Sequence, residues 1–129
     1  METYLFVAAD SFDKSNFQGL VAFADAFPEF FDVSLEDENQ FNTLLRLIGL
    51  SIPQKLILED NEDFQCLYDI SNQTMKEFSE EAFDEFYQQW LAETRRENSM
   101  DEYGQLIFIL GQAITWNKMA HKFILRERA

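Results

Sequence analysis

Runs of apolar residues predict four strands. Residues 3–9 are almost continuously apolar, which is typical of a strand that is buried on both faces and lies inside a sheet. Residues 64–70 place apolar side chains at every second position, the pattern of a strand with one buried face. Shorter apolar runs at 55–59 and within 121–128 predict the other two strands.

Apolar residues at helical spacing predict four helices, at residues 15–27, 37–48, 74–91 and 99–114. Each of these begins with Ser, Thr or Asp, followed three residues later by Gln or Glu. Such a pair caps the free backbone N–H groups of a first helical turn. The clearest apolar stripe belongs to the third helix and consists of Phe83, Phe86, Tyr87, Trp90 and Leu91.

The resulting order, β-α-α-β-β-α-α-β, predicts an α+β fold with a small, mostly antiparallel sheet of about four strands packed by about four helices. We expect residues 1–129 to form a single domain, because the chain has single-domain length and 47% of its residues are hydrophobic. Residues 29–36 fit neither a helix nor a strand clearly. In an extended conformation Phe30 and Phe31 point to opposite sides, so one of them is expected to reach the surface.

Three glycines have predicted roles in this scheme. Gly49 follows the second predicted helix and fits a C-terminal cap. Gly104 and Gly111 lie seven positions apart in the fourth predicted helix and therefore on one side of it. The missing side chains there permit close approach by a neighbouring element; the alternative is that they only weaken the helix.

The charge of the chain is unevenly distributed. Residues 1–90 hold 19 acidic residues against 4 basic ones, net −15, whereas residues 91–129 hold 5 against 6, net +1. A surface this negative repels nucleic acid and anionic membranes and attracts basic partners. The chain starts without a basic stretch or a long apolar run, and its single cysteine, Cys66, cannot form an internal disulfide. We therefore expect a soluble, cytoplasmic protein.

Acidic residues concentrate in two segments that we predict to bind a partner. The first lies on the third predicted helix, opposite its apolar stripe, and comprises Glu77, Glu80, Glu81, Asp84 and Glu85. The second is the predicted hairpin loop before the third strand and comprises Asp60, Glu62 and Asp63. Like charges four residues apart on a helix repel by about 0.2–0.5 kcal/mol per pair, and the helix dipole offsets this only in the first turn. A helix face without lysines fits a cationic partner or, alternatively, a merely solubilising surface.

Recognisable catalytic motifs are missing from the sequence. It contains no glycine-rich phosphate loop, no G-x-S-x-G, no H-E-x-x-H and no paired C-x-x-C. We expect His121 to have a surface or capping role and Cys66 to be a small buried apolar residue. We therefore predict no catalytic residue, no metal site and no cofactor, although the carboxylates at 36–39 and 60–63 leave a divalent-cation site or an acid/base pair open.

Small size, localised acidity and missing catalytic motifs together predict a non-enzymatic inhibitor or immunity-type protein. Its acidic surface would dock on a basic toxin or nuclease, without direct binding to nucleic acid or membranes. One alternative is an inhibitor that mimics the phosphate array of nucleic acid. A second is a small enzyme that uses two carboxylates or a metal ion, and a third is a subunit of a larger complex. The partner and the oligomeric state are not identified by the sequence.

Overall fold

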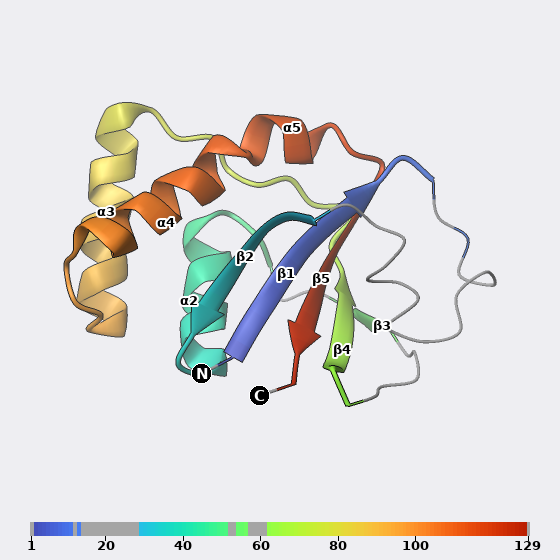
Figure 1. The fold of residues 1–129 in the computed structure, drawn as a ribbon. Helices are drawn as coiled ribbons and strands as arrows, with labels where there is room; N and C mark the ends of the chain where they lie inside the picture. Colours follow the sequence, from blue (N-terminus) through green and yellow to red (C-terminus); the bar gives the residue numbers. More distant parts are fainter. Residues whose placement is uncertain (1, 12, 14–28, 52–53, 57–61, 129) are drawn as a thin grey trace.

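A computed structural model describes residues 2–11, 13, 29–51, 54–56 and 62–128 of the chain (Figure 1), and the structural statements below refer to these residues. They form one sheet of five strands in the order β2-β1-β5-β4-β3, with every neighbouring pair antiparallel. The strands are β1 (Glu2–Ala9), β2 (Glu29–Leu35), β3 (Gln54–Leu56), β4 (Phe64–Asp69) and β5 (His121–Glu127). The helices are α2 (Glu38–Leu47), α3 (Glu80–Thr94), α4 (Met100–Gly111) and α5 (Ala113–Asn117).

The small antiparallel α+β fold predicted from the sequence is therefore confirmed, but the predicted order of elements is not. The described part of the chain contains a strand, β2, that the sequence pattern did not assign. The helix predicted at 15–27 and the second half of the strand predicted at 55–59 lie outside the described residues. Strand β1 is an interior strand, as expected, and β5 occupies the centre of the sheet.

A bulge explains why the sequence pattern did not predict β2 as a strand. Phe6 of β1 pairs with Phe31, whereas the next residue, Val7, pairs with Glu29, so Phe30 is an extra residue in β2. Both phenylalanine rings contact Trp116 of α5, with ring centroids 5.6 Å away for Phe30 and 6.1 Å away for Phe31. Phe31 is buried, whereas Phe30 is half-buried, so the bulge lets both rings contact Trp116 while Phe30 keeps part of its surface exposed, as expected for one of the two.

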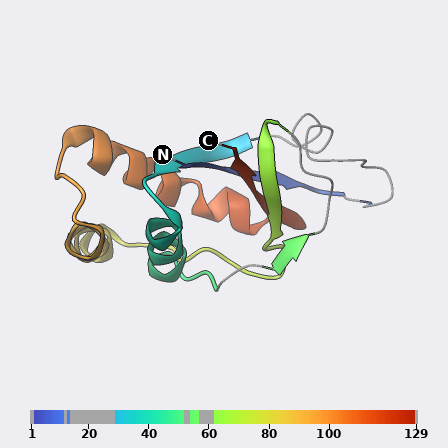
Figure 2. The ribbon, with the colours of Figure 1, turned by 90° about the horizontal axis from the view of Figure 1, so that it is seen from below.

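The helices lie on one face of the sheet (Figures 1 and 2). Between the two layers, Tyr4 stacks on Phe41 of α2 at a centroid distance of 3.9 Å, and Phe6 stacks on Phe31 at 4.3 Å. Trp90 and Trp116 are completely buried in the same core. These aromatic side chains provide most of the large apolar surfaces that hold helices and sheet together.

The third helix begins later than the sequence predicts. Ser79, not Thr74, is its N-cap and accepts a hydrogen bond from the backbone N–H of Ala82 at 3.2 Å. The backbone before it is bound elsewhere: the side-chain amide of Asn117 accepts from Met75 N at 2.7 Å and donates to Met75 O at 2.8 Å. These bonds to α5 take the place of helical ones, so residues 74–78 remain outside the helix.

The starts of α2 and α4 and the end of α2 follow the predicted caps, whereas the helix predicted at 99–114 is interrupted at Gln112, where α4 ends and α5 follows. Ser99 caps α4 by accepting from the backbone N–H of Glu102 at 3.1 Å, and Asp37 caps α2 by accepting from Gln40 N at 2.9 Å. Gly49 takes the left-handed conformation, φ 84°, that closes α2. Leu50 completes this cap, because its N–H donates to the carbonyl of Leu45 at 2.8 Å. Among the described helices, none has the length and apolar character needed to cross a membrane.

Candidate partner-binding surface

Helix α3 carries only negative charge. Its 15 residues include five acids, Glu80, Glu81, Asp84, Glu85 and Glu93, and no Lys or Arg. All five side chains are exposed. Within the described part of the chain, only Glu93 among them forms an ion pair, with Arg46 of α2. As far as the described residues show, the remaining four acids present charge to solvent without an ion partner.

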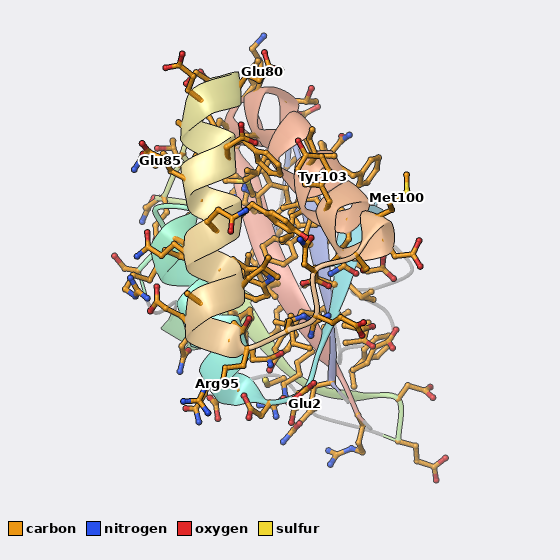
Figure 3. All side chains as sticks on the ribbon, turned by 90° about the vertical axis from the view of Figure 1, so that its left-hand side faces the viewer. Glu2, Glu80, Glu85, Arg95, Met100 and Tyr103 are labelled. Carbon is orange, nitrogen blue, oxygen red and sulfur yellow. The ribbon has the colours of Figure 1, made fainter. Side chains whose placement is uncertain are left out.

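These acids face two different directions. In a regular helix residues 80 and 84 are about 40° apart around the axis, whereas residues 80 and 85 are about 140° apart. Glu80 lines the groove between α3 and α4, so the helical spacing places Asp84 toward the same side, whereas Glu85 points away from α4 (Figure 3). Glu77, which was predicted to belong to the helix, lies in the segment before it.

The side of α3 near α2 has mixed charge. A hollow of about 330 Å³ there is lined by Glu77 and Glu85 together with Arg46 and Lys76. The ammonium group of Lys76 also lies 5.6 Å from the ring centroid of Phe78. Because bases stand beside the acids on this side, its attraction for a cationic partner is reduced.

The side of α3 near α4 is apolar and acidic. A groove of about 320 Å³ runs between the two helices, and aromatic and aliphatic side chains provide most of its lining. Among the described residues that line it, Glu80 is the one charged residue. The apolar lining residues are Phe78, Phe83, Tyr103, Ile107, Leu110 and Gly111. A larger hollow of about 600 Å³ beside α2 contains none of the predicted acidic residues.

Packed aromatic rings form one wall of this groove. Tyr103 of α4 meets Phe83 and Tyr87 of α3 nearly at right angles, with ring centroids 5.0 and 5.1 Å apart. Edge-to-face contacts of this kind add about 0.5–1.5 kcal/mol beyond the burial of area. The Tyr87 hydroxyl donates to Asn98 Oδ1 at 2.8 Å, which ties the same ring to the loop between the helices.

A buried polar cluster holds α3 and α4 in register. The carboxylate of Glu102 accepts from Trp90 Nε1 at 2.7 Å and from the guanidinium of Arg96 at 2.8 and 3.0 Å. Arg96 also donates to Gln40 Oε1 at 3.0 Å, so the cluster reaches α2. The side chains of Glu102 and Arg96 are only 9% and 15% exposed. Sequence reasoning assigned Glu102 only a capping role and missed this cluster.

The outward side of α4 and α5 exposes large apolar side chains. Met100 is 92% exposed, Ile114 56%, Phe108 54% and Ile107 46%. No residue from 103 to 117 carries a charge. Contiguous exposed apolar surface of this kind marks interaction sites in soluble proteins more often than single scattered residues do.

The second predicted acidic segment lies elsewhere. Glu62 and Asp63 are exposed and directly precede β4, while Asp60 lies outside the described residues. Both ribbon views place the start of β4 far from α3, across the sheet (Figures 1 and 2). The backbone carbonyl of Asp63 accepts from Arg128 N at 2.9 Å, which ties this segment to the end of β5. The two predicted acidic segments therefore do not form one surface.

The two other side chains considered for chemistry, Cys66 and His121, pack within the sheet. Cys66 is buried in β4, and His121 is half-buried and stacks on Phe123 at a centroid distance of 6.5 Å. Among the described residues, no group of three or more His, Cys, Asp or Glu is close enough together to hold a metal ion.

Two titratable groups inside the sheet were not anticipated. Lys122 of β5 is buried and its Nζ donates to the backbone carbonyl of Gln73; burial lowers the pKa of Lys122. Burial, together with a hydrogen bond to Cys66, raises the pKa of Tyr68 to about 12. The alternation of side chains along β4 and β5 predicts which positions point inward. It does not predict that the polar groups of Tyr68 and Lys122 occupy such positions.

Comparisons of the chain with protein-family models, with curated proteins and with solved structures found no match.

Proposed function

We propose that this chain is a non-enzymatic acidic binding protein that inhibits a basic protein, such as a toxin or a nuclease, by docking on it. The observation that carries the proposal is helix α3, which has five acids, no base and four exposed carboxylates without an ion partner in the described chain. The docking residues are Glu80, Glu81 and Asp84, with Glu85 on the adjoining side.

Folding alone gives no reason for this charge pattern. The pairs Glu80–Asp84 and Glu81–Glu85 are four residues apart within the helix and repel each other. The helix dipole stabilises the negative charges of Glu80 and Glu81 in the first turn and so offsets part of their repulsion. Asp84 and Glu85 lie beyond the first turn and gain little from the dipole. Lysines interleaved with these acids would remove the repulsion. A helix face that carries acids alone is expected where the protein binds a cationic surface.

Docking on one partner is better supported than mimicry of nucleic acid. A mimic needs carboxylates along an extended surface, comparable to a charge every 1.7 Å or so along the DNA axis. Here the described acids of α3 and those before β4 lie at different ends of the sheet. A compact acidic site beside an apolar groove suits a single protein partner.

Affinity capture from the native cell tests this proposal, with the wild-type chain compared with a variant carrying Glu81→Lys, Asp84→Lys and Glu85→Lys. The control variant carries Asp32→Lys, Glu36→Lys and Glu62→Lys, which are exposed positions and give the same net charge. We expect wild type and control to retain a basic protein whose activity the purified chain inhibits, and the α3 variant to lose it. Retention by all three chains, or capture of only neutral or acidic proteins, would contradict the proposal.

A further inference from the structure

We infer that the groove between α3 and α4 binds one amphipathic helix of the partner protein, whose apolar side lies on α4 and whose basic residues lie beside α3. This inference rests on the proposed function and adds the shape and chemistry of the bound segment. Figure 3 shows the end of the molecule concerned, with α3 and α4 side by side, Glu80 on the first helix and Tyr103 on the second.

The outward side of α4 has the spacing on which a second helix packs. Met100 and Ile107 of α4 are seven residues apart, Tyr103 and Leu110 each follow three residues after them, and Ile114 continues the same spacing on α5, beyond the turn at Gln112. Apolar residues that alternate at three and four positions form the contact line of paired helices. A different side of α4 and α5 is buried against the chain itself, through Glu102, Leu106, Ile109, Ala113 and Trp116. Helix α4 thus has a second apolar side that the described chain covers only in part: Tyr103 packs on α3 and Leu110 on the core, while Met100 and Ile107 remain exposed.

Two glycines leave room for close approach on this second side. Gly104 and Gly111 lie next to the contact line, and apart from their chain neighbours and the backbone of their own helix, no described atom stands within 4 Å of the position that a Cβ would occupy on either of them. Their small size is therefore not required by the packing of the described residues. A helix laid along α4 gains from it, because its backbone comes nearer and makes more contacts.

The charges beside the groove select a cationic helix. Glu80 lines the groove, Asp84 follows one turn later on the same side, and α3 contributes no base. A second copy of this chain, with net charge −14, would bring a second row of acids toward the first. Lysine or arginine residues flanking an apolar stripe would instead form ion pairs with α3 while leucine-like residues fill the groove.

Binding of a synthetic peptide to the full chain tests this inference. The probe is a peptide of about 18 residues with leucine at heptad spacing and lysine elsewhere, and a permuted peptide of equal composition without an apolar side is its control. Binding is followed by fluorescence anisotropy of the labelled peptide at low and high salt. The wild-type chain should bind the amphipathic peptide saturably and the permuted one much more weakly.

Two variants separate the apolar and the acidic contributions. Ile107→Ser with Ile114→Ser removes exposed apolar groups, and Glu80→Gln with Asp84→Lys removes the acids beside the groove; each should weaken binding by about tenfold or more. The charge control, Glu36→Lys with Glu62→Gln, has the same net charge and should bind like wild type. Circular dichroism confirms that each variant keeps the fold.

The possible outcomes distinguish this inference from the proposed function. If only the acid variant weakens binding, the proposed acidic docking surface is retained and the inference of a helix-binding groove is wrong. If neither variant weakens binding relative to the charge control, the helix-binding groove is wrong, while the capture experiment with the Glu81, Asp84 and Glu85 variant still decides the proposed function. Sedimentation velocity provides the remaining check: a dimer that Ile107→Ser with Ile114→Ser dissociates would show that a second copy covers α4, and would overturn the inference.

Discussion

The indole Nε1 of Trp90 donates a 2.7 Å hydrogen bond to Oε1 of Glu102, and this buried contact joins α3 to α4. The guanidinium of Arg96 binds both oxygens of the same carboxylate. Because most of the groove's lining belongs to these two helices, the Glu102 contacts help to fix the distance between its walls, together with the packing of Tyr103 on Phe83 and Tyr87.

Replacing Glu102 should destabilise the fold strongly. Glu102→Ala leaves the Arg96 charge and the Trp90 N–H without their buried acceptor, which should lower the free energy of unfolding by about 3 kcal/mol. Glu102→Gln keeps an acceptor for Trp90 and should cost less. Urea denaturation followed by circular dichroism measures both. An equal loss for the two variants would show that the side chain acts by packing and not through its carboxylate.

Removing repulsion on α3 should stabilise the free protein. Asp84→Lys converts the repulsive pair with Glu80 into an attractive one in the favourable order, which should raise the free energy of unfolding by about 0.5 kcal/mol at low salt. The gain should shrink at high salt, because exposed charges are screened. The same variant should bind the partner more weakly. A variant that is both more stable and unimpaired in binding would mean that the acids have only a solubilising role.

Two glycine substitutions should have opposite effects on stability. Gly49 has φ 84°, and an added Cβ there would stand 3.2 Å from Lys76 Cβ. Gly49→Ala should therefore lower the free energy of unfolding by about 1–2 kcal/mol. Gly104→Ala meets open space within α4 and should raise it by up to about 1 kcal/mol. Thermal unfolding of the two variants checks the signs; the same sign for both would contradict this account of the glycines.

Lys122 should make stability rise with pH in the alkaline range. Burial lowers the pKa of Lys122 in the folded state, whereas the unfolded chain keeps the usual value of 10.5. Below the folded-state pKa, the cost of burying the charged Lys122 lowers stability in full. Between that pKa and 10.5 the unfolded state binds more protons than the folded state, so the free energy of unfolding rises with pH. Lys122→Met should remove this rise. Urea denaturation at a series of pH values below 10 provides the comparison.

Tyr68 should have the opposite effect at higher pH. The pKa of its phenol is raised from 10.0 to about 12 in the folded state, so the associated stability is full below pH 10 and is lost between pH 10 and 12. Tyr68→Phe should therefore make alkaline unfolding less steep. Tyr4 shifts in the same direction, since burial and its hydrogen bond to Glu2 raise its pKa. Absorbance titration of the tyrosines, compared with alkaline unfolding, tests both assignments.

Local patterns predicted the elements whose partners are near in sequence. The caps at Asp37 and Ser99, the left-handed Gly49 and the strand at 64–69 depend on neighbouring residues, and all are present. The start of α3 was wrong, because the competing bonds come from Asn117, 42 residues away from Met75. Long-range contacts of this kind leave no periodic signal in the sequence.

The candidate site was predicted in part for the same reason. The acidic residues of α3 are exposed as expected. Which of them lie toward α4 and which toward α2 depends on where these two helices pack against α3. The apolar outward side of α4 was the larger omission. Its heptad spacing was visible in the sequence, yet both apolar sides of α4 together resemble one buried helix until the covered side is known.

Site-specific photo-crosslinking in the native cell tests the central claim most directly. A photoreactive amino acid replaces Ile107, in the groove beside the acids of α3, or Gln65, an exposed position of β4, as the matched control. We expect Ile107 to crosslink to one basic protein, within a helix that has lysine or arginine beside an apolar stripe, and Gln65 to yield no such product. No product from Ile107, the same product from Gln65, or a partner without excess positive charge would contradict the account.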